Sequence, residues 1–269
     1  MQPIGVFDSG VGGLSVLKAL RQTLPQARFV YVSDAGHAPY GERDVQHVLD
    51  RSAAIGRYLV EEHQVQALVV ACNTATAAAI ATLRANYPAL PIVGVEPALK
   101  PAAARSRTGV VGVLATRSTL ASDKFAALLQ TQDPRVRFVL KACDGLAAAI
   151  ENADTEEIQR LCARYTAALG SFGSGPGEID TVVLGCTHYT FAANVLGTLV
   201  GPDVLLMDAG LPVAQRTASL LQTIDGDVGT VSTTGSWVEL LTTGSATALE
   251  DAARQWLGGT DAARQLDIV

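Results

Sequence analysis

The sequence predicts an α/β fold of two similar lobes, each a mainly parallel sheet flanked by helices. The chain has 269 residues, of which 48% are hydrophobic and 17% are charged, so it holds enough apolar material for a large core. Short apolar runs alternate with longer amphipathic stretches from one end to the other, a pattern typical of parallel strands connected by helices. In addition, three segments within residues 5–74 recur in the same order within residues 112–188.

Strands are predicted at the short apolar runs that are bounded by turn residues. These runs are Ile4–Phe7, Phe29–Ser33, Ala67–Ala71, Ile92–Val95, Val110–Leu114, Arg137–Leu140, Thr181–Leu184, Val204–Met207 and Gly229–Thr233. Helices are predicted where apolar residues recur every three to four positions. These stretches are Gly13–Gln22, Val45–Glu62, Ala75–Asn86, Leu120–Gln130, Thr155–Leu169, Phe191–Val200, Pro212–Thr223 and Ser236–Trp256.

The internal repeat predicts the domain organisation. The matched segments are residues 5–7 with 112–114, residues 28–30 with 137–139, and residues 67–74 with 181–188. Because the matches keep their order, we expect two similar βαβ lobes related by a pseudo-twofold axis. One lobe is formed by residues 1–96 together with 209–269, and the other by residues 97–208.

Charge and hydropathy exclude several functional classes. The 20 basic and 26 acidic residues give a net charge of −6, without a block of like charge, which argues against nucleic acid or an anionic membrane surface as partner. No apolar run approaches the roughly 18 residues that a membrane span needs. The first residues lack the features of a secretory signal. We therefore expect a soluble, cytoplasmic protein.

The four cysteines are Cys72, Cys143, Cys162 and Cys186. They form no CxxC pair and no Cys/His cluster at zinc-binding spacing, so we expect no metal site and a reducing compartment. Cys162 falls on the apolar stripe of a predicted helix, and Cys143 lacks a polar pair like the Asn73-Thr74 that follows Cys72 or the Thr187-His188 that follows Cys186. Both are predicted to be core residues.

Cys72 and Cys186 occupy equivalent points of the repeat. Each follows a buried strand and precedes a helix, at the edge of the sheet where α/β proteins bind ligands, and a helix N-terminus lowers the pKa of a thiol. If the lobes face each other, the two thiols flank one active site between them. Two acid/base groups on opposite faces of one carbon are what racemisation requires, since one removes the α-proton and the other returns a proton.

Two polar turns follow the first two strands. Asp8–Gly13 is a helix cap with turn glycines or a group that binds a carboxylate or tunes a base. It does not fit a dinucleotide fingerprint, because Ser15 stands where the last glycine belongs, and a phosphate-loop lysine is missing. Asp34–Gly41 is a plain turn, or else its backbone amides and Tyr40 line the same cleft.

Four segments carry a family resemblance: Asp8-Ser9-Gly10, Pro39-Tyr40-Gly41, Cys72-Asn73-Thr74-Ala75 and Leu184-Gly185-Cys186-Thr187-His188-Tyr189. They resemble the signature segments of glutamate racemases, which belong to the cofactor-independent aspartate/glutamate racemase superfamily. The resemblance spans nearly the whole chain. It implies interconversion of L- and D-glutamate without pyridoxal phosphate, metal or nucleotide, which supplies D-glutamate for peptidoglycan, and it implies a homodimer.

The resemblance also implies residue roles. Cys72 acts on D-glutamate and Cys186 on L-glutamate, with Asp8 and His188 tuning the thiols and Glu151 as a supporting acid. The residues implied to hold the substrate are Asp8, Ser9, Tyr40, Gly41, Asn73, Thr74, Thr116, Thr119, Thr187 and His188.

Three alternatives stay open at this point. The first is another amino-acid racemase of the superfamily, acting on aspartate or a hydantoin. The second is an acyl-transfer enzyme in which Cys186 is the nucleophile and His188 its base, although residues two apart at a helix start need not face each other and Cys72 then has no role. The third is a non-catalytic, two-lobed binding protein.

Overall fold

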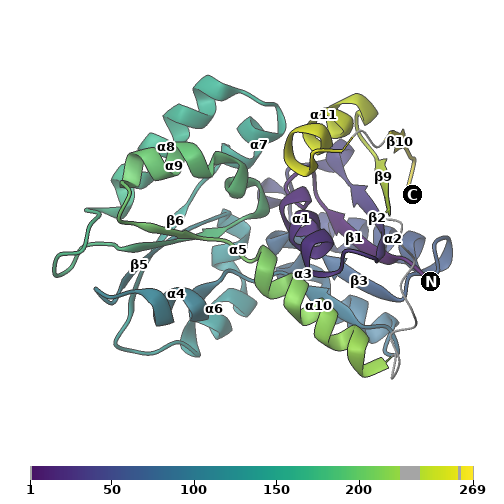
Figure 1. The fold of residues 1–269 in the computed structure, drawn as a ribbon, viewed down its shortest axis with the longest axis horizontal. Helices are drawn as coiled ribbons and strands as arrows, with labels where there is room; N and C mark the ends of the chain where they lie inside the picture. Colours follow the sequence, from purple (N-terminus) through teal and green to yellow (C-terminus); the bar gives the residue numbers. More distant parts are fainter. Residues whose placement is uncertain (1, 225–236, 260–261, 269) are drawn as a thin grey trace. The chain divides into compact units, whose positions relative to one another are not determined.

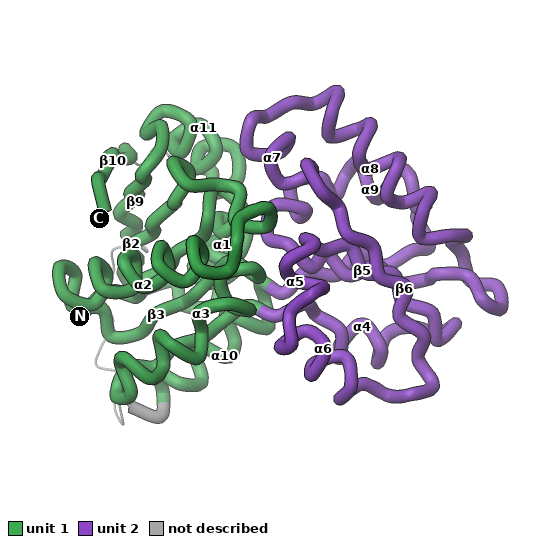
Figure 2. The backbone as a smooth tube through the Cα atoms, turned by 180° about the vertical axis from the view of Figure 1, so that it is seen from behind, with its two compact units in different colours: residues 1–95, 210–269 green, residues 96–209 purple. Residues whose placement is uncertain are grey.

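The computed structural model describes residues 2–224, 237–259 and 262–268 (Figure 1). The chain forms two compact units, which Figure 2 shows in different colours. Unit 1 contains residues 1–95 and 210–269, and unit 2 contains residues 96–209. Unit 1 is therefore discontinuous in sequence, with unit 2 inserted into it.

Unit 1 is built on a sheet of six parallel strands. They are β1 (Ile4–Asp8), β2 (Arg28–Ser33), β3 (Ala67–Val70), β4 (Ile92–Gly94), β9 (Trp237–Thr242) and β10 (Ala263–Gln265), in the spatial order β10-β9-β2-β1-β3-β4. The central strands read as continuous apolar runs because helices cover both faces of the sheet. Leu68, Val69 and Val70, for example, are fully buried.

The helices of unit 1 are α1 (Leu14–Thr23), α2 (Val45–Glu61), α3 (Asn73–Asn86), α10 (Gly210–Ile224) and α11 (Ala246–Leu257). Short 3-10 helices at Ala35–His37 and Tyr40–Glu42 lie between β2 and α2. α2 and α3 pack together over one face of the sheet and share a core cluster with Phe7, Val32 and Val70. α1 packs against α10 and α11.

Unit 2 is built on a sheet of four parallel strands. They are β5 (Val110–Ala115), β6 (Arg137–Ala142), β7 (Thr181–Gly185) and β8 (Leu205–Met207), in the order β6-β5-β7-β8. Successive side chains of a strand point to opposite faces. Accordingly, Val110 and Leu114 belong to one core cluster, while Val111 and Val113 belong to another.

The helices of unit 2 cover both faces of its sheet. They are α4 (Leu99–Arg105), α5 (Arg117–Ala121), α6 (Asp123–Gln130), α7 (Leu146–Glu151), α8 (Thr155–Leu169) and α9 (Ala193–Val200), with a 3-10 helix at Thr187–Ala192. α7, α8 and α9 supply buried residues to the cluster that contains Leu114. α4 and α6 supply residues such as Leu99 and Phe125 to the cluster on the other face.

The sheet orders confirm the predicted fold of two similar α/β lobes. β2-β1-β3-β4 in unit 1 and β6-β5-β7-β8 in unit 2 have the same order and direction. The three sequence matches fall on β1 and β5, on β2 and β6, and on β3 and β7. Strands β9 and β10 extend the sheet of unit 1 beyond this shared arrangement.

The helix predicted over Ser236–Trp256 is wrong in its first part. Residues 237–242 form β9, which pairs with β2 along its whole length, and α11 begins only after Ser245 caps its N-terminus. Val238, Leu240 and Leu241 are buried in the sheet, so pairing with β2 overrides the helical period that α11 contributes to this stretch. Ser236 and the strand predicted at Gly229–Thr233 lie outside the described residues.

The single helix predicted over Leu120–Gln130 is two helices. Ser122 has an extended backbone, and its Oγ accepts a hydrogen bond of 3.1 Å from the Phe125 N–H. That contact ends α5 and caps α6. Among the residues that the structure describes, no helix has both the length and the apolar composition to cross a bilayer.

Candidate active site

The sheet order places a ligand site at the same edge in each unit. The chain leaves β1 toward β2 on one side and returns to β3 on the other, and ligands of such sheets bind at the carboxyl ends of the strands where the order reverses. In unit 1 the residues at this point are Ser9 and Cys72, after β1 and β3. In unit 2 they are Thr116 and Cys186, after β5 and β7.

Cys72 is a buried thiol at the start of α3, with 5% of its surface exposed. Its Sγ accepts a hydrogen bond of 3.5 Å from the Ala75 N–H, so the thiol caps the helix. The thiol also donates to Ser9 Oγ at 3.7 Å. Backbone N–H groups at a helix N-terminus stabilise negative charge, so this environment supports a thiolate at Cys72.

Asp8 ends β1 and is fully buried. Its Oδ1 accepts a hydrogen bond of 2.8 Å from the Gly10 N–H, and the Gly10 carbonyl accepts one of 2.7 Å from the Tyr31 hydroxyl. A Cβ on Gly13 would lie 2.5 Å from the Asp8 Cβ. The turn after β1 therefore holds Asp8 in one position, and only glycine fits beside it.

Asn73 and Thr74 form the first turn of α3, and each is 5% exposed. The Oδ1 atom of Asn73 is buried and has no hydrogen-bond partner among the described protein atoms. A buried carbonyl oxygen without a partner is costly. The residue directly after Cys72 thus presents a buried acceptor oxygen.

Tyr40 is 1% exposed, and its hydroxyl donates a hydrogen bond of 2.5 Å to Asp34 Oδ2. Burial first, and then the negative charge of Asp34, raise the pKa of Tyr40 far above its ordinary value. The phenol therefore stays protonated, and its proton is directed at Asp34. Gly41 follows Tyr40 in the same 3-10 helix.

Cys186 is 7% exposed and lies beside a histidine–carboxylate pair. Its Sγ is 3.9 Å from His188 Nδ1, and His188 Nε2 is 2.6 Å from Glu151 Oε2 at the end of α7. Burial by itself lowers the pKa of His188, but the hydrogen bonds to Cys186 and Glu151 and the charges of both outweigh it and raise the pKa well above 6.5. The imidazole ring is therefore held protonated between the Cys186 sulfur and the Glu151 carboxylate.

The hydroxyl groups of unit 2 lie near the same edge of its sheet. Thr116 follows β5 and caps α5, since its Oγ1 accepts a hydrogen bond of 3.1 Å from the Thr119 N–H. The two hydroxyls are hydrogen-bonded at 2.8 Å. Thr187, directly after Cys186, is 6% exposed. All three side chains are polar and buried, as groups that hold a polar ligand are.

The other two cysteines belong to the core of unit 2, as predicted. Cys162 is fully buried, and burial raises its pKa to about 11. Cys143 is 2% exposed, and burial followed by the charge of Cys186 raises its pKa further. Neither thiol ionises at neutral pH, so neither is suited to acid/base chemistry.

Comparison with known proteins now identifies the family. Residues 4–222 match the Asp/Glu/Hydantoin racemase family. The chain belongs to this family. Glutamate racemases of Ectopseudomonas mendocina and Pseudomonas syringae pv. tomato are 49% and 47% identical to it over 221 residues, which is 81% of this chain and 82% and 78% of theirs.

Solved racemase structures share the fold. Glutamate racemase isoform RacE1 of Bacillus anthracis is 30% identical with a TM-score of 0.86, over 99% of this chain and 98% of that one. The Escherichia coli glutamate racemase, solved with L-glutamate and the activator UDP-MurNAc-Ala, is 28% identical with a TM-score of 0.82 over 100% of both chains.

Membership of the racemase family decides between two interpretations of the Cys186 cluster. The spatial arrangement of Cys186, His188 and Glu151 also resembles a nucleophile with its base and orienting carboxylate, although the sequence spacing did not favour such contact. That interpretation gives Cys72 no role. In the part of the chain that the structure describes, no group of three or more His, Cys, Asp or Glu side chains is arranged to hold a metal ion.

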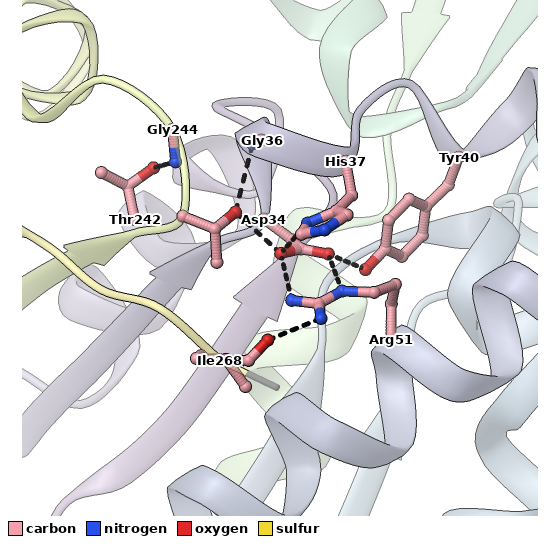
Figure 3. Close-up of polar contacts among 9 residues, drawn as sticks. Asp34, Gly36, His37, Tyr40, Arg51, Thr242, Gly244 and Ile268 are labelled. Carbon is pink, nitrogen blue, oxygen red and sulfur yellow. Dashed lines mark hydrogen bonds and ion pairs between the residues drawn. The ribbon is translucent and has the colours of Figure 1, made fainter.

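Sequence reasoning missed the side chain of Arg51 in this racemase. Arg51 Nε and Nη2 donate to Asp34 at 3.0 and 2.9 Å (Figure 3). The available signal was its register, because Arg51 stands between Val48 and Ile55 on the buried face of α2. A charged residue on an apolar stripe requires a buried partner.

Proposed function

We propose that this protein is a glutamate racemase that interconverts L- and D-glutamate with two cysteine bases. The observation that carries the proposal is the equivalent position of Cys72 and Cys186, each after the third strand of a β2-β1-β3-β4-type sheet. The glutamate racemases that are nearly half identical to the chain support the substrate.

In the proposed reaction, one thiolate removes the α-proton and the opposite thiol returns a proton. With L-glutamate, the Cys186 thiolate takes the proton, which leaves a carbanion and a Cys186 thiol. The Cys72 thiol then protonates the other face, which gives D-glutamate and a Cys72 thiolate. The reverse direction exchanges these roles. Each sulfur has to approach the α-carbon to roughly 3–3.5 Å from opposite faces, so a disulfide between them is incompatible with turnover.

The remaining polar groups have two proposed tasks. The first is to keep the thiols ready to ionise, by Asp8, Ser9 and the α3 N-terminus for Cys72 and by His188 with Glu151 for Cys186. The second is to hold the amino and carboxylate groups of glutamate. The residues proposed for this are Ser9, Gly41, Asn73, Thr74, Thr116, Thr119 and Thr187. The Tyr40 hydroxyl donates to Asp34, so the proposed role of Tyr40 is to hold Gly41 in position by the packing of its ring.

We further propose that the reaction needs no pyridoxal phosphate, metal or nucleotide, and that the product supplies peptidoglycan synthesis in the cytoplasm. Activity is expected to survive dialysis against EDTA and treatment with hydroxylamine. Activity that returns only with added pyridoxal phosphate would contradict this. We also propose a homodimer, which light scattering at working concentration tests.

The direct test uses L-glutamate alone in deuterated water. A racemase exchanges the α-proton for deuterium while the optical rotation of the solution decays to zero, and both are measured on one sample by proton NMR and circular dichroism. An acyl-transfer enzyme or a binding protein does neither. L-aspartate in the parallel sample separates this proposal from a racemase for the shorter substrate.

A further inference from the structure

Asp34 is the centre of a buried polar network that includes Tyr40 and Arg51 (Figure 3). Its side chain is fully buried, and both carboxylate oxygens are occupied. Oδ2 accepts from the Tyr40 hydroxyl at 2.5 Å and from Arg51 Nε at 3.0 Å. Oδ1 accepts from Arg51 Nη2 at 2.9 Å and Thr243 Oγ1 at 2.8 Å, and lies 3.1 Å from His37 Nδ1.

Arg51 is the constant positive charge of this network. The other basic group beside Asp34, His37, is 37% exposed and carries charge only when protonated. Burial tends to raise the pKa of Asp34, but the hydrogen bonds from Arg51, Tyr40 and Thr243, with the Arg51 charge, hold it below its usual value. Asp34 is therefore a buried carboxylate, and its neutralisation depends on one arginine that pairs through two nitrogens.

The same arginine holds the end of the chain. Arg51 Nη1 donates a hydrogen bond of 2.7 Å to the Ile268 carbonyl. Thr243, after β9, accepts from the Gly36 N–H through Oγ1 at 3.1 Å and donates from its own backbone to Ser33 O at 3.0 Å. Segments far apart in sequence thus meet around the Asp34–Arg51 pair, with Thr243 bonded to Asp34 and Ile268 bonded to Arg51.

Tyr40 connects this network to Cys72. Both residues belong to the same buried cluster of unit 1, and the 3-10 helix that contains Tyr40 packs against α3, which begins directly after Cys72. Tyr40 is 1% exposed, and its hydroxyl already donates a hydrogen bond to Asp34. Its effect on the site therefore comes from where its ring packs. A shift of Asp34 is therefore expected to move Tyr40 and to change the packing around Cys72.

We propose that Arg51 is a positioning residue of the site: it neutralises Asp34, fixes Tyr40 and Gly41 beside Cys72, and ties the C-terminal segment to that support through Ile268. Its kinetic consequence rests on the proposed function. Without Arg51, Asp34 is an uncompensated buried charge, and the Tyr40–Gly41 segment relaxes to hydrate it. When Arg51 and the charge of Asp34 are both removed, no buried charge needs hydration, so the Tyr40–Gly41 segment is expected to keep its position.

The kinetic test compares Arg51→Ala, the double variant Arg51→Ala/Asp34→Asn, and Arg57→Ala. Arg57 is an exposed arginine of the same helix and serves as the matched control. Arg51→Ala is expected to raise KM for both enantiomers by about tenfold or more. The double variant is expected to recover most of that loss, because the charge is gone, and Arg57→Ala to match the unaltered protein. A merely structural role reduces the folded fraction and hence the apparent kcat, while leaving KM unchanged.

A second arm does not depend on activity. Iodoacetamide alkylation is followed at the Cys72 and Cys186 peptides by mass spectrometry, without substrate. Arg51→Ala is expected to speed alkylation of Cys72 several-fold and leave Cys186 as the internal reference. A chain ending at Asp267, which lacks the Ile268 carbonyl, is expected to shift Cys72 in the same direction by less.

The two arms keep the outcomes distinct. If the unaltered protein does not racemise glutamate, the proposed function fails and the alkylation arm still decides the role of Arg51. If Arg51→Ala is folded, with KM and Cys72 alkylation unchanged, the inference is overturned. It is also overturned if the double variant is as impaired as Arg51→Ala, because the loss then does not come from the charge of Asp34. If Arg51→Ala does not fold, the double variant and the shortened chain supply the same readouts.

Discussion

His188 Nε2 lies 2.6 Å from Glu151 Oε2, while the other nitrogen of the ring faces the Cys186 sulfur. The Cys72 sulfur accepts a hydrogen bond from the Ala75 N–H and donates one to the Ser9 hydroxyl. The two thiols occupy equivalent points of similar units, but the polar groups around them differ.

The first prediction concerns stability and pH. The pKa of His188 is raised well above 6.5, because its hydrogen bonds to Cys186 and Glu151 outweigh the effect of burial. A raised pKa contributes stability that is complete below the unfolded value of 6.5 and is lost as pH rises through the folded value. The difference in the free energy of unfolding between the unaltered protein and His188→Asn is therefore expected to shrink as pH rises above about 6.5. Urea titrations at several pH values measure it, and a difference independent of pH would contradict the charged state.

The second prediction concerns Glu151→Gln, which keeps a hydrogen bond to His188 but removes the charge. We expect kcat/KM to fall by up to about tenfold, and equally in both directions, since the enantiomers have the same free energy. The two directions are expected to differ in their kinetic isotope effects. Proton transfer at Cys186 becomes more limiting, so the effect of α-deuteration rises for L-glutamate and falls for D-glutamate. Glu157→Gln, at an exposed ion pair with Arg160, is the control. Isotope effects that change alike for both enantiomers would disprove a link to Cys186.

The third prediction uses the unpartnered oxygen of Asn73. Asn73→Ala removes no hydrogen bond at Oδ1 in the free protein, so the free energy of unfolding is expected not to fall. Substrate binding loses a polar contact, so KM for glutamate is expected to rise by about tenfold. Asn86→Ala, at the exposed end of the same helix, is expected to change neither. A marked loss of stability in Asn73→Ala would show that the side chain has a structural role instead.

The fourth prediction compares two glycines. A Cβ on Gly13 would lie 2.5 Å from Asp8 Cβ and 2.9 Å from the Tyr31 hydroxyl, whereas one on Gly197 in α9 meets nothing nearer than 3.9 Å. Gly13→Ala is expected to destabilise by about 1–3 kcal/mol and to reduce activity, because Asp8 is displaced. Gly197→Ala is expected to stabilise by up to about 1 kcal/mol. Thermal unfolding measures both, and equal shifts would show that the turn after β1 adapts.

Local sequence predicted the helices correctly where a single periodic pattern of apolar residues ran through the whole segment. Val45–Glu62 and Thr155–Leu169 were predicted within a residue of α2 and α8, because each has an apolar stripe and an acidic N-cap. Residues 237–242 were mistaken for helix, since their state is decided by pairing with β2, over 200 residues away in sequence. The internal repeat predicted two similar lobes, because it relates whole segments rather than single residues, and the strand order came only from the structure.

The site could be predicted only as far as residue types and strand ends allow. The repeat identified Cys72 and Cys186 as candidate site residues. The family resemblance added Asp8, His188 and Glu151. The contact between His188 and Cys186 was not predictable from spacing, because it depends on the 3-10 helix that follows β7. Arg51 and Thr243 meet at Asp34 only through the fold, so no local pattern could pair them.

The central claim is that Cys72 and Cys186 act on opposite enantiomers, and deuterium exchange by single variants tests it most directly. In Cys72→Ser, Cys186 still takes the proton from L-glutamate, but no competent acid faces it, so L-glutamate is expected to gain deuterium without racemising. Cys186→Ser is expected to confine exchange to D-glutamate, and both variants to lose net racemisation. Cys162→Ala, which alters a buried core thiol, is the control and should racemise normally. Exchange of both enantiomers by either serine variant, or retained racemisation, would contradict the account.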